Sequence, residues 1–336
     1  MAITLLAVVA LMTQASACSP GRPGSGAAPS APAPTQTTTS ERPDAAAVKA
    51  NELGLVPVLM YHRLVAEPKA EFDRRPEDFR AELQLLFDQG YRPVTAAELA
   101  ARRLDVPAGT TPVVLTFDDS TRDQFALGDD DSVDPSSAIG ILIDFSRTHP
   151  DFRPVATMYV NADPFGVRDG VRLLRKLADL GIELGEHTAT HANLARLDAT
   201  NVQRELVLGQ RVITDATGQA PRTMALPFGV RPVDRSLAAA GSWDGEAYSF
   251  EANFLVGAGP APSPFADAFE PQAVPRIRSS SWAGGPPNLG SAYWLDWLAG
   301  NPDKRYVADG NPDAVSFPSA ERPRLDPAFT ARARAY

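Results

Sequence analysis

The chain has 336 residues and a formal net charge of −9 at pH 7, with 41 acidic against 32 basic side chains. This acidic balance argues against nucleic acid as a partner, because phosphate binding needs clustered basic side chains. With one cysteine, the chain forms no internal disulfide, so the fold must rely on its apolar core.

The N-terminal segment has the composition of a targeting sequence. A short apolar run ends in small residues, so residues 1–17 are predicted to be a signal peptide. Cys18 follows directly, as in bacterial lipoproteins, where this cysteine carries the lipid. Cleavage of the A-x-A site after Ala17 is the alternative, and it would release a secreted protein. We expect an extracytoplasmic protein whose contact with a membrane is limited to this anchor.

Two regions of different composition follow the signal peptide. Residues 18–50 are rich in Pro, Ser, Thr and Ala and have few large apolar side chains, which predicts a disordered tether. Residues 51–336 contain no internal linker or repeat, and we expect one monomeric domain there.

Apolar runs and amphipathic patterns alternate through this domain. Strands are predicted at 56–61, 112–117, 155–160, 182–185, 223–227, 249–256 and 273–278. Helices are predicted at 76–90, 95–103, 136–149, 170–181 and 200–218, with capping-box pairs at Thr95–Glu98 and Thr200–Gln203. This alternation predicts an α/β fold with a parallel sheet, and about seven such units favour a distorted (β/α)7-type barrel.

Possible metal ligands directly follow several of the predicted strands. His62 ends the first run, Asp118 and Asp119 end the next, and His187 and His191 follow a later one. The carboxyl ends of the strands of such a barrel meet at one rim, so these side chains should converge there. Two neutral imidazoles and a carboxylate suit Zn²⁺ or a similar divalent ion.

Each of these motifs has a less specific interpretation when it is taken alone. An Asp pair after a strand often caps a helix or stabilises a turn. A pair of histidines four residues apart is a weak signal, and Thr188 stands where zinc proteases of this pattern have Glu. The combination therefore carries the prediction.

The combined motifs resemble the polysaccharide deacetylases (NodB-homology domain, carbohydrate esterase family 4). The resemblance covers most of residues 55–280 and includes TFDD, H-T-x-x-H and LPFG. Many members have a catalytic histidine near the C-terminal end of the domain, but this chain has none after His191. The segment MYH, which ends at His62, instead resembles the permuted branch of poly-N-acetylglucosamine deacetylases.

The resemblance implies metal-dependent removal of N-acetyl groups from an N-acetylglucosamine-containing polysaccharide at the cell envelope. The divalent ion, most simply Zn²⁺, would be bound by Asp119, His187 and His191. Asp118 would be the catalytic base, and His62 would protonate the departing amine. Substrate contacts are expected from Pro227, Phe228, Gly229 and Arg276.

Some residues depart from the family pattern. Ser120 follows TFDD where Gly is usual, and its hydroxyl is expected either to contact the metal ligands or to cap a helix. Ala225 replaces an Arg that often orients the base; the candidates to substitute for it are Arg63, Arg222, Arg231 and Arg276. Glu186 is expected either to fix the tautomer of His187 or to be exposed.

The sequence also leaves other features open. Residues 128–134 form an acidic insertion, interpreted as a solvated loop rather than a Ca²⁺ site because EF-hand spacing is absent. Two other functions stay possible. One is a non-catalytic glycan-binding protein with a degenerate site, and the other is a glycoside hydrolase that uses a carboxylate pair.

Overall fold

The structure is a computed structural model that describes residues 44–257, 259–279 and 290–336. The expected signal peptide, Cys18 and most of the expected tether lie outside the described residues. Residues 45–49 form turns and Ala50 is buried. Among the described helices, none combines the length and the apolar character needed to cross a membrane.

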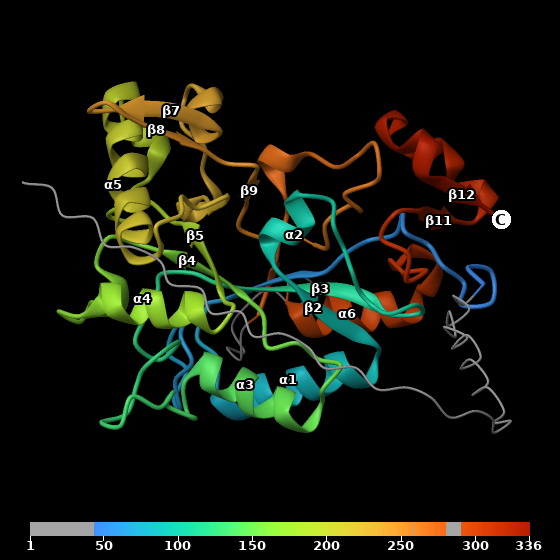
Figure 1. Cartoon of the computed structure of the whole chain (residues 1–336), viewed down its shortest axis with the longest axis horizontal. Helices are drawn as coiled ribbons and strands as arrows, with labels where there is room; N and C mark the ends of the chain where they lie inside the picture. Colours follow the sequence, from blue (N-terminus) through green and yellow to red (C-terminus); the bar gives the residue numbers. More distant parts are fainter. Residues whose placement is uncertain (1–43, 258, 280–289) are drawn as a thin grey trace, which may run out of the picture. The chain divides into compact units, whose positions relative to one another are not determined.

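A parallel eight-stranded sheet forms the centre of residues 44–336 (Figure 1). Its path is β10-β1-β3-β4-β5-β6-β9, and β2 pairs with β3 beside that path. The strands are β1 (Val58–Tyr61), β2 (Tyr91–Val94), β3 (Thr111–Phe117), β4 (Thr157–Val160), β5 (Glu183–Glu186), β6 (Thr223–Ala225), β9 (Ala252–Phe254) and β10 (Ile277–Arg278). Outside the sheet lie an antiparallel pair, β7 (Ala240–Trp243) with β8 (Glu246–Ser249), and a parallel pair, β11 (Val315–Phe317) with β12 (Ala333–Ala335).

One short segment brings the two ends of this path together. Val274 forms a parallel bridge with Phe254 of β9, and Ile277 pairs with Leu59 of β1. The segment 274–278 thus contacts both outer strands and curls the sheet toward closure. The predicted distorted (β/α)7-type barrel is confirmed.

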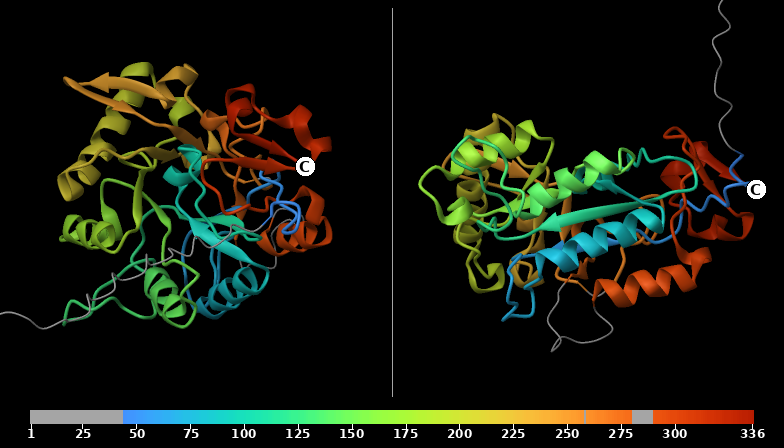
Figure 2. Two further views of the ribbon diagram at one scale, coloured as in Figure 1. Left: turned by 45° about the vertical axis from the view of Figure 1, so that its right-hand side comes forward. Right: turned by 90° about the horizontal axis from the view of Figure 1, so that it is seen from below.

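Helices cover the outside of the sheet (Figures 1 and 2). They are α1 (Pro76–Asp88), α2 (Ala96–Ala100), α3 (Ala138–Thr148), α4 (Gly170–Asp179), α5 (Ala199–Thr217) and α6 (Ser291–Gly300). Helices α1 and α3 pack side by side, as do α4 and α5. Each long helix buries one apolar face against the strands; in α4 that face consists of Leu173, Leu174 and Leu177.

The structure differs from the sequence prediction at a few boundaries. Strand β2 was not predicted, because Pro93 interrupts its apolar run; the proline is tolerated because β2 pairs only with β3. The capping box at Thr95–Glu98 is confirmed. The one predicted at Thr200 is wrong, because Asp198 caps α5 by accepting a hydrogen bond from the backbone N–H of Asn201.

The first described residues pack against a segment from the far end of the chain. The N–H of Asn51 donates to the carbonyl of Val307, and the N–H of Leu55 donates to that of Lys304. At Gly54 the two backbones approach so closely that an added Cβ would lie 2.3 Å from the carbonyl carbon of Arg305. Glycine is therefore required at this contact.

We predict that Gly54→Ala destabilises the protein by about 1–3 kcal/mol, because the methyl group would overlap a backbone held on both sides. Thermal unfolding measures this change. The matched control is Gly300→Ala at the end of α6, where an added Cβ meets no atom within 4 Å. Equal melting temperatures for the two variants would contradict the prediction.

Candidate metal and catalytic site

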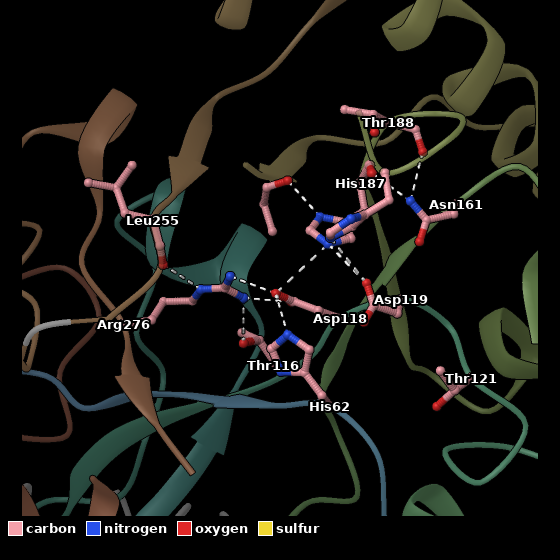
Figure 3. Close-up of polar contacts among 12 residues, drawn as sticks. His62, Thr116, Asp118, Asp119, Thr121, Asn161, His187, Thr188, Leu255 and Arg276 are labelled. Carbon is pink, nitrogen blue, oxygen red and sulfur yellow. Dashed lines mark hydrogen bonds and ion pairs between the residues drawn. The ribbon is translucent and has the colours of Figure 1, made fainter. Parts of the chain in front are cut away.

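The predicted site residues meet at the carboxyl ends of three strands (Figure 3). His62 follows β1, Asp118 and Asp119 follow β3, and His187 follows β5. These strands are parallel members of one sheet, so their ends lie at the same rim. Residues far apart in the sequence thereby share one cluster.

Asp119, His187 and His191 form the one group in the described part of the chain with an arrangement suited to a metal ion. The Asp119 Oδ1 lies 3.4 Å from Nε2 of His187 and 3.5 Å from Nε2 of His191. Burial would raise the pKa of Asp119, but the neighbouring imidazoles of His187 and His62 together outweigh it and hold the pKa below its ordinary value. The carboxylate is therefore ionised, as a metal ligand must be.

The protein fixes the orientation of the His187 ring. Nδ1 donates to the carbonyl of Ala225 at 2.8 Å, so the lone pair of the neutral ring lies on Nε2. Nε2 is buried and has no hydrogen-bond partner among the described residues. An imidazole held through one nitrogen, with the other free and facing a carboxylate, fits a divalent ion.

Two polar side chains hold the loop that carries His191. Asn161, after β4, donates from Nδ2 to the carbonyls of His187 and Thr188, at 2.6 and 2.9 Å. Glu205, on α5, accepts a 2.9 Å hydrogen bond from the N–H of Thr190. Neither Asn161 nor Glu205 was singled out from the sequence, because their partners are backbone groups that no motif identifies.

The backbone of the site adopts conformations that side chains other than glycine rarely take. Positive φ angles occur at Asp119 (74°), Ser120 (44°), Thr188 (61°), His191 (54°) and Phe228 (60°). Each such residue costs roughly 1–3 kcal/mol unless its surroundings enforce it. The left-handed conformation at Ser120 also explains why glycine is usual at this position.

A buried ion pair holds the candidate base. Asp118 and Arg276 are 2% and 0% exposed, and the guanidinium donates from both terminal nitrogens to the two carboxylate oxygens at 2.7 Å (Figure 3). Burial would raise the pKa of Asp118, but the charge and hydrogen bonds of Arg276, together with the nearby imidazoles of His187 and His62, outweigh it and hold the pKa well below its usual range. Arg276 is fixed in turn by donating from Nε to the carbonyl of Leu255 at 2.8 Å.

This contact identifies which arginine takes the role of the arginine that Ala225 replaces. Among the four candidates only Arg276 contacts Asp118; the other three pair elsewhere, Arg63 with Asp73, Arg222 with Glu251 and Arg231 with the carbonyl of Gln272. The expectation that Arg276 contacts substrate is not supported, because its side chain is fully buried beneath the carboxylate. The structure shows instead that it positions the candidate base.

His62 lies beside the same carboxylate. Its Nε2 is 3.8 Å from Oδ2 of Asp118, and 15% of its side chain is exposed. Burial lowers the pKa of His62, although the charges of Asp118 and Asp119 oppose that change. The imidazole is thus placed to exchange a proton with a group bound between it and the metal ligands.

The LPFG segment contributes an exposed ring to the site. Phe228 is 58% exposed, and its ring centroid lies 4.7 Å from that of His191. Pro227 starts this short helical turn, and Gly229, with φ of 67°, packs against Val256. Of the three substrate contacts expected here, Phe228 presents the largest apolar surface next to the candidate metal ligands.

Two expectations for neighbouring residues are wrong. Glu186 is neither exposed nor bonded to the ring of His187, which donates to Ala225 instead. Its carboxyl group packs against Gly209 of α5, and burial raises its pKa well above the ordinary value. The hydroxyl of Ser120 is buried and has no hydrogen-bond partner in the described residues, so it neither contacts the metal ligands nor caps a helix.

The acidic insertion 128–134 is a solvated loop, as predicted. A bridge between Leu127 and Val133 closes it, and Asp131 forms a 2.7 Å ion pair with Arg172 of α4. Its acidic residues form no metal-binding group with one another.

Part of the chain matches known proteins. The family model described as polysaccharide deacetylase matches residues 150–243. A chitooligosaccharide deacetylase from Bradyrhizobium sp. (strain ANU 289) is 32% identical over 124 residues, which cover 37% of this chain and 48% of that protein. A chitin deacetylase from Pestalotiopsis sp. is 27% identical over 135 residues, covering 40% and 42%. The chain thus spans about half the length of these curated relatives.

Solved structures with the same fold cover more of the chain. The Streptococcus pyogenes deacetylase PplD in complex with acetate aligns with a TM-score of 0.54 at 19% identity, over 72% of this chain and 97% of that one. IcaB from Ammonifex degensii aligns with a TM-score of 0.51 at 17% identity, over 73% and 97%. These likenesses concern the fold alone.

The matched segment 150–243 contains His187, His191 and the LPFG turn, and the barrel adds His62, Asp118 and Asp119 to them. In its motifs, its matched segment and its barrel, this chain is similar to the polysaccharide deacetylases.

Proposed function

We propose that this protein is a metal-dependent deacetylase that hydrolyses N-acetyl groups of an N-acetylglucosamine-containing polysaccharide at the cell envelope. The proposal rests on two sets of side chains that lie next to each other. Asp119, His187 and His191 form a candidate metal site, and Asp118 and His62 lie directly beside it. Amide hydrolysis needs both sets, because the carbonyl must be polarised and the amine must leave protonated.

The roles of the residues follow from their contacts. A divalent ion bound by the three ligands, which we propose to be Zn²⁺, would polarise the acetyl carbonyl and acidify a water molecule. Asp118 is ionised and aimed by Arg276, so it accepts the proton of the attacking water. His62, on the other side of that carboxylate, donates a proton to the nitrogen of the departing amine.

The relatives and the residues beside the site support this proposed substrate class. The relatives are named as deacetylases of chitin and chitooligosaccharides, polymers that present the N-acetylglucosamine unit. Next to the ligands, the exposed ring of Phe228 offers an apolar face on which a sugar ring stacks. Poly-N-acetylglucosamine, chitin-like oligomers and peptidoglycan are the polymers to compare.

We predict that the purified protein binds one divalent ion per chain and that His187→Ala reduces this binding by at least about 10-fold, because the site loses a ligand held in place by Ala225. Titration calorimetry with Zn²⁺ measures the change. His149→Ala is the control, since this histidine packs on Phe145 away from the site. Chelator treatment should abolish amine release from N-acetylglucosamine oligomers. Full activity in metal-free protein would exclude the mechanism.

We predict that Asp118→Asn and His62→Ala each lower kcat/KM for amine release by about 10²–10⁴-fold, the usual contribution of general acid–base groups. Both variants keep all three metal ligands, so zinc binding should persist. Asp144→Asn, on the exposed face of α3, is the control for a carboxylate removed elsewhere. A metal-loaded wild-type protein that binds glycan without releasing amine would instead be a binding protein. Chain cleavage unaffected by His187→Ala would indicate a glycoside hydrolase.

We propose further that the protein is lipid-anchored through Cys18 outside the cytoplasm. The position of this sole cysteine after an apolar run and small residues supports the proposal. Cys18→Ser should therefore abolish incorporation of labelled fatty acid and move the protein from the membrane fraction to the medium or the soluble fraction. Unchanged membrane fractionation of that variant would contradict a lipid anchor.

A further inference from the structure

A general acid must present one nitrogen to its target at a fixed angle. Histidines in active sites usually achieve this through a hydrogen bond to the nitrogen on the far side of the ring. In His62 that nitrogen, Nδ1, is buried and has no hydrogen-bond partner among the described residues. A different contact must therefore hold this imidazole in the plane that points Nε2 toward Asp118.

The ring of Phe72 supplies that contact. It stacks on the imidazole of His62 with a centroid distance of 4.5 Å and an angle of 22° between the planes. A stacked neighbour leaves an imidazole free to slide but resists tilting, because tilting forces the two faces apart. The stack thus restricts the same rotation that a hydrogen bond to Nδ1 would restrict.

Phe72 is itself held by a residue of the segment that closes the barrel. The guanidinium of Arg278 lies 5.6 Å from the centroid of the Phe72 ring, and it forms an ion pair with Glu71. Arg278 sits opposite Met60 in the β10–β1 pairing, which places it two residues from the position of His62. His62, Phe72 and Arg278 therefore form a connected set of planar groups at the end of β1.

The loop between β1 and α1 presents Phe72 in a defined position. Arg63 donates from Nε and a terminal nitrogen to the two carboxylate oxygens of Asp73, each at 2.8 Å. A parallel bridge between Leu64 and Arg74 closes the same loop. With its base fastened this way, the loop holds Phe72 against His62 rather than leaving it free in solvent.

We propose that Phe72 is a positioning residue for proton donation, acting through His62, and that Arg278 supports it. This inference rests on the proposed deacetylase function. In that reaction the hydroxyl of water forms the new bond to the acetyl carbon. The C–N bond breaks, and the nitrogen takes the electron pair and the proton of His62. Loss of the stack should therefore slow only reactions whose leaving group needs that proton.

The experiment compares two substrates of one protein. An N-acetylglucosamine oligomer releases an amine, which leaves poorly without a proton, whereas 4-nitrophenyl acetate releases a stable phenolate that needs none. Phe72→Leu should lower kcat for amine release by about 10-fold, with KM little changed, and should alter kcat/KM for the aryl ester by less than about 2-fold. Phe72→Tyr, which keeps the ring, should retain both activities.

Two controls separate positioning from a general structural effect. Phe145→Leu removes an equivalent stack at the end of α3, where the ring centroids of Phe145 and His149 are 4.0 Å apart. This variant should leave both activities unchanged. Added to His62→Ala, Phe72→Leu should cause no further loss, because the two residues act as one unit. If Phe72→Leu does not fold, Arg278→Gln provides the same test with a smaller expected loss of amine release.

The outcomes distinguish this inference from the proposed function. Equal losses on the amide and on the aryl ester would overturn the role of Phe72, as would unchanged amine release by Phe72→Leu. A wild-type protein that releases no amine would instead overturn the deacetylase function, whatever the variants do.

Discussion

The buried ion pair between Asp118 and Arg276 is the contact on which the rest of the site depends. Two charges removed from water are costly, and only mutual neutralisation with good geometry makes them tolerable. Here the geometry is bidentate, and Thr116 and the carbonyl of Leu255 accept the remaining bonds from the guanidinium. Removing either partner would leave an uncompensated buried charge, at a cost of about 3–5 kcal/mol. The pair therefore both orients the candidate base and stabilises the barrel.

The backbone near this pair is strained, and the strain orients the side chains of the site. Both Asp119 and His191, two of the three candidate ligands, have positive φ angles. Asn161 and Glu205 compensate by bonding to the backbone of the loop that carries His191. The ligands are thus directed by backbone geometry, which the neighbouring hydrogen bonds enforce.

Much of the fold follows from periodicity. Alternating apolar runs and amphipathic helices predicted the barrel, and the positions of His62, His187 and the Asp pair directly after strands predicted their meeting at one rim. What the sequence did not reveal are contacts between residues distant in sequence and free of motifs. Arg276 lies 158 residues from Asp118, so only the closing segment of the barrel identifies it among four candidate arginines.

Local rules failed where tertiary packing decides the outcome. Glu186 was predicted to be exposed or bonded to a ligand, because carboxylates rarely enter an apolar interface. The alternation of side chains along the strand instead turns it toward Gly209 of α5. Phe72 stands in a polar stretch that resembles an ordinary surface loop. Its proximity to His62 depends on the bridge between Leu64 and Arg74, which sequence periodicity does not encode.

The position of Arg276 also has a consequence for the order in which the site is assembled. All three candidate ligands, the candidate base and the candidate acid precede residue 192, whereas the arginine that neutralises the base enters with the segment that closes the sheet. During synthesis, a nascent chain holds every reactive group long before it holds the partner of Asp118. The segment that closes the barrel therefore also supplies Asp118 with its partner, and both happen late in synthesis.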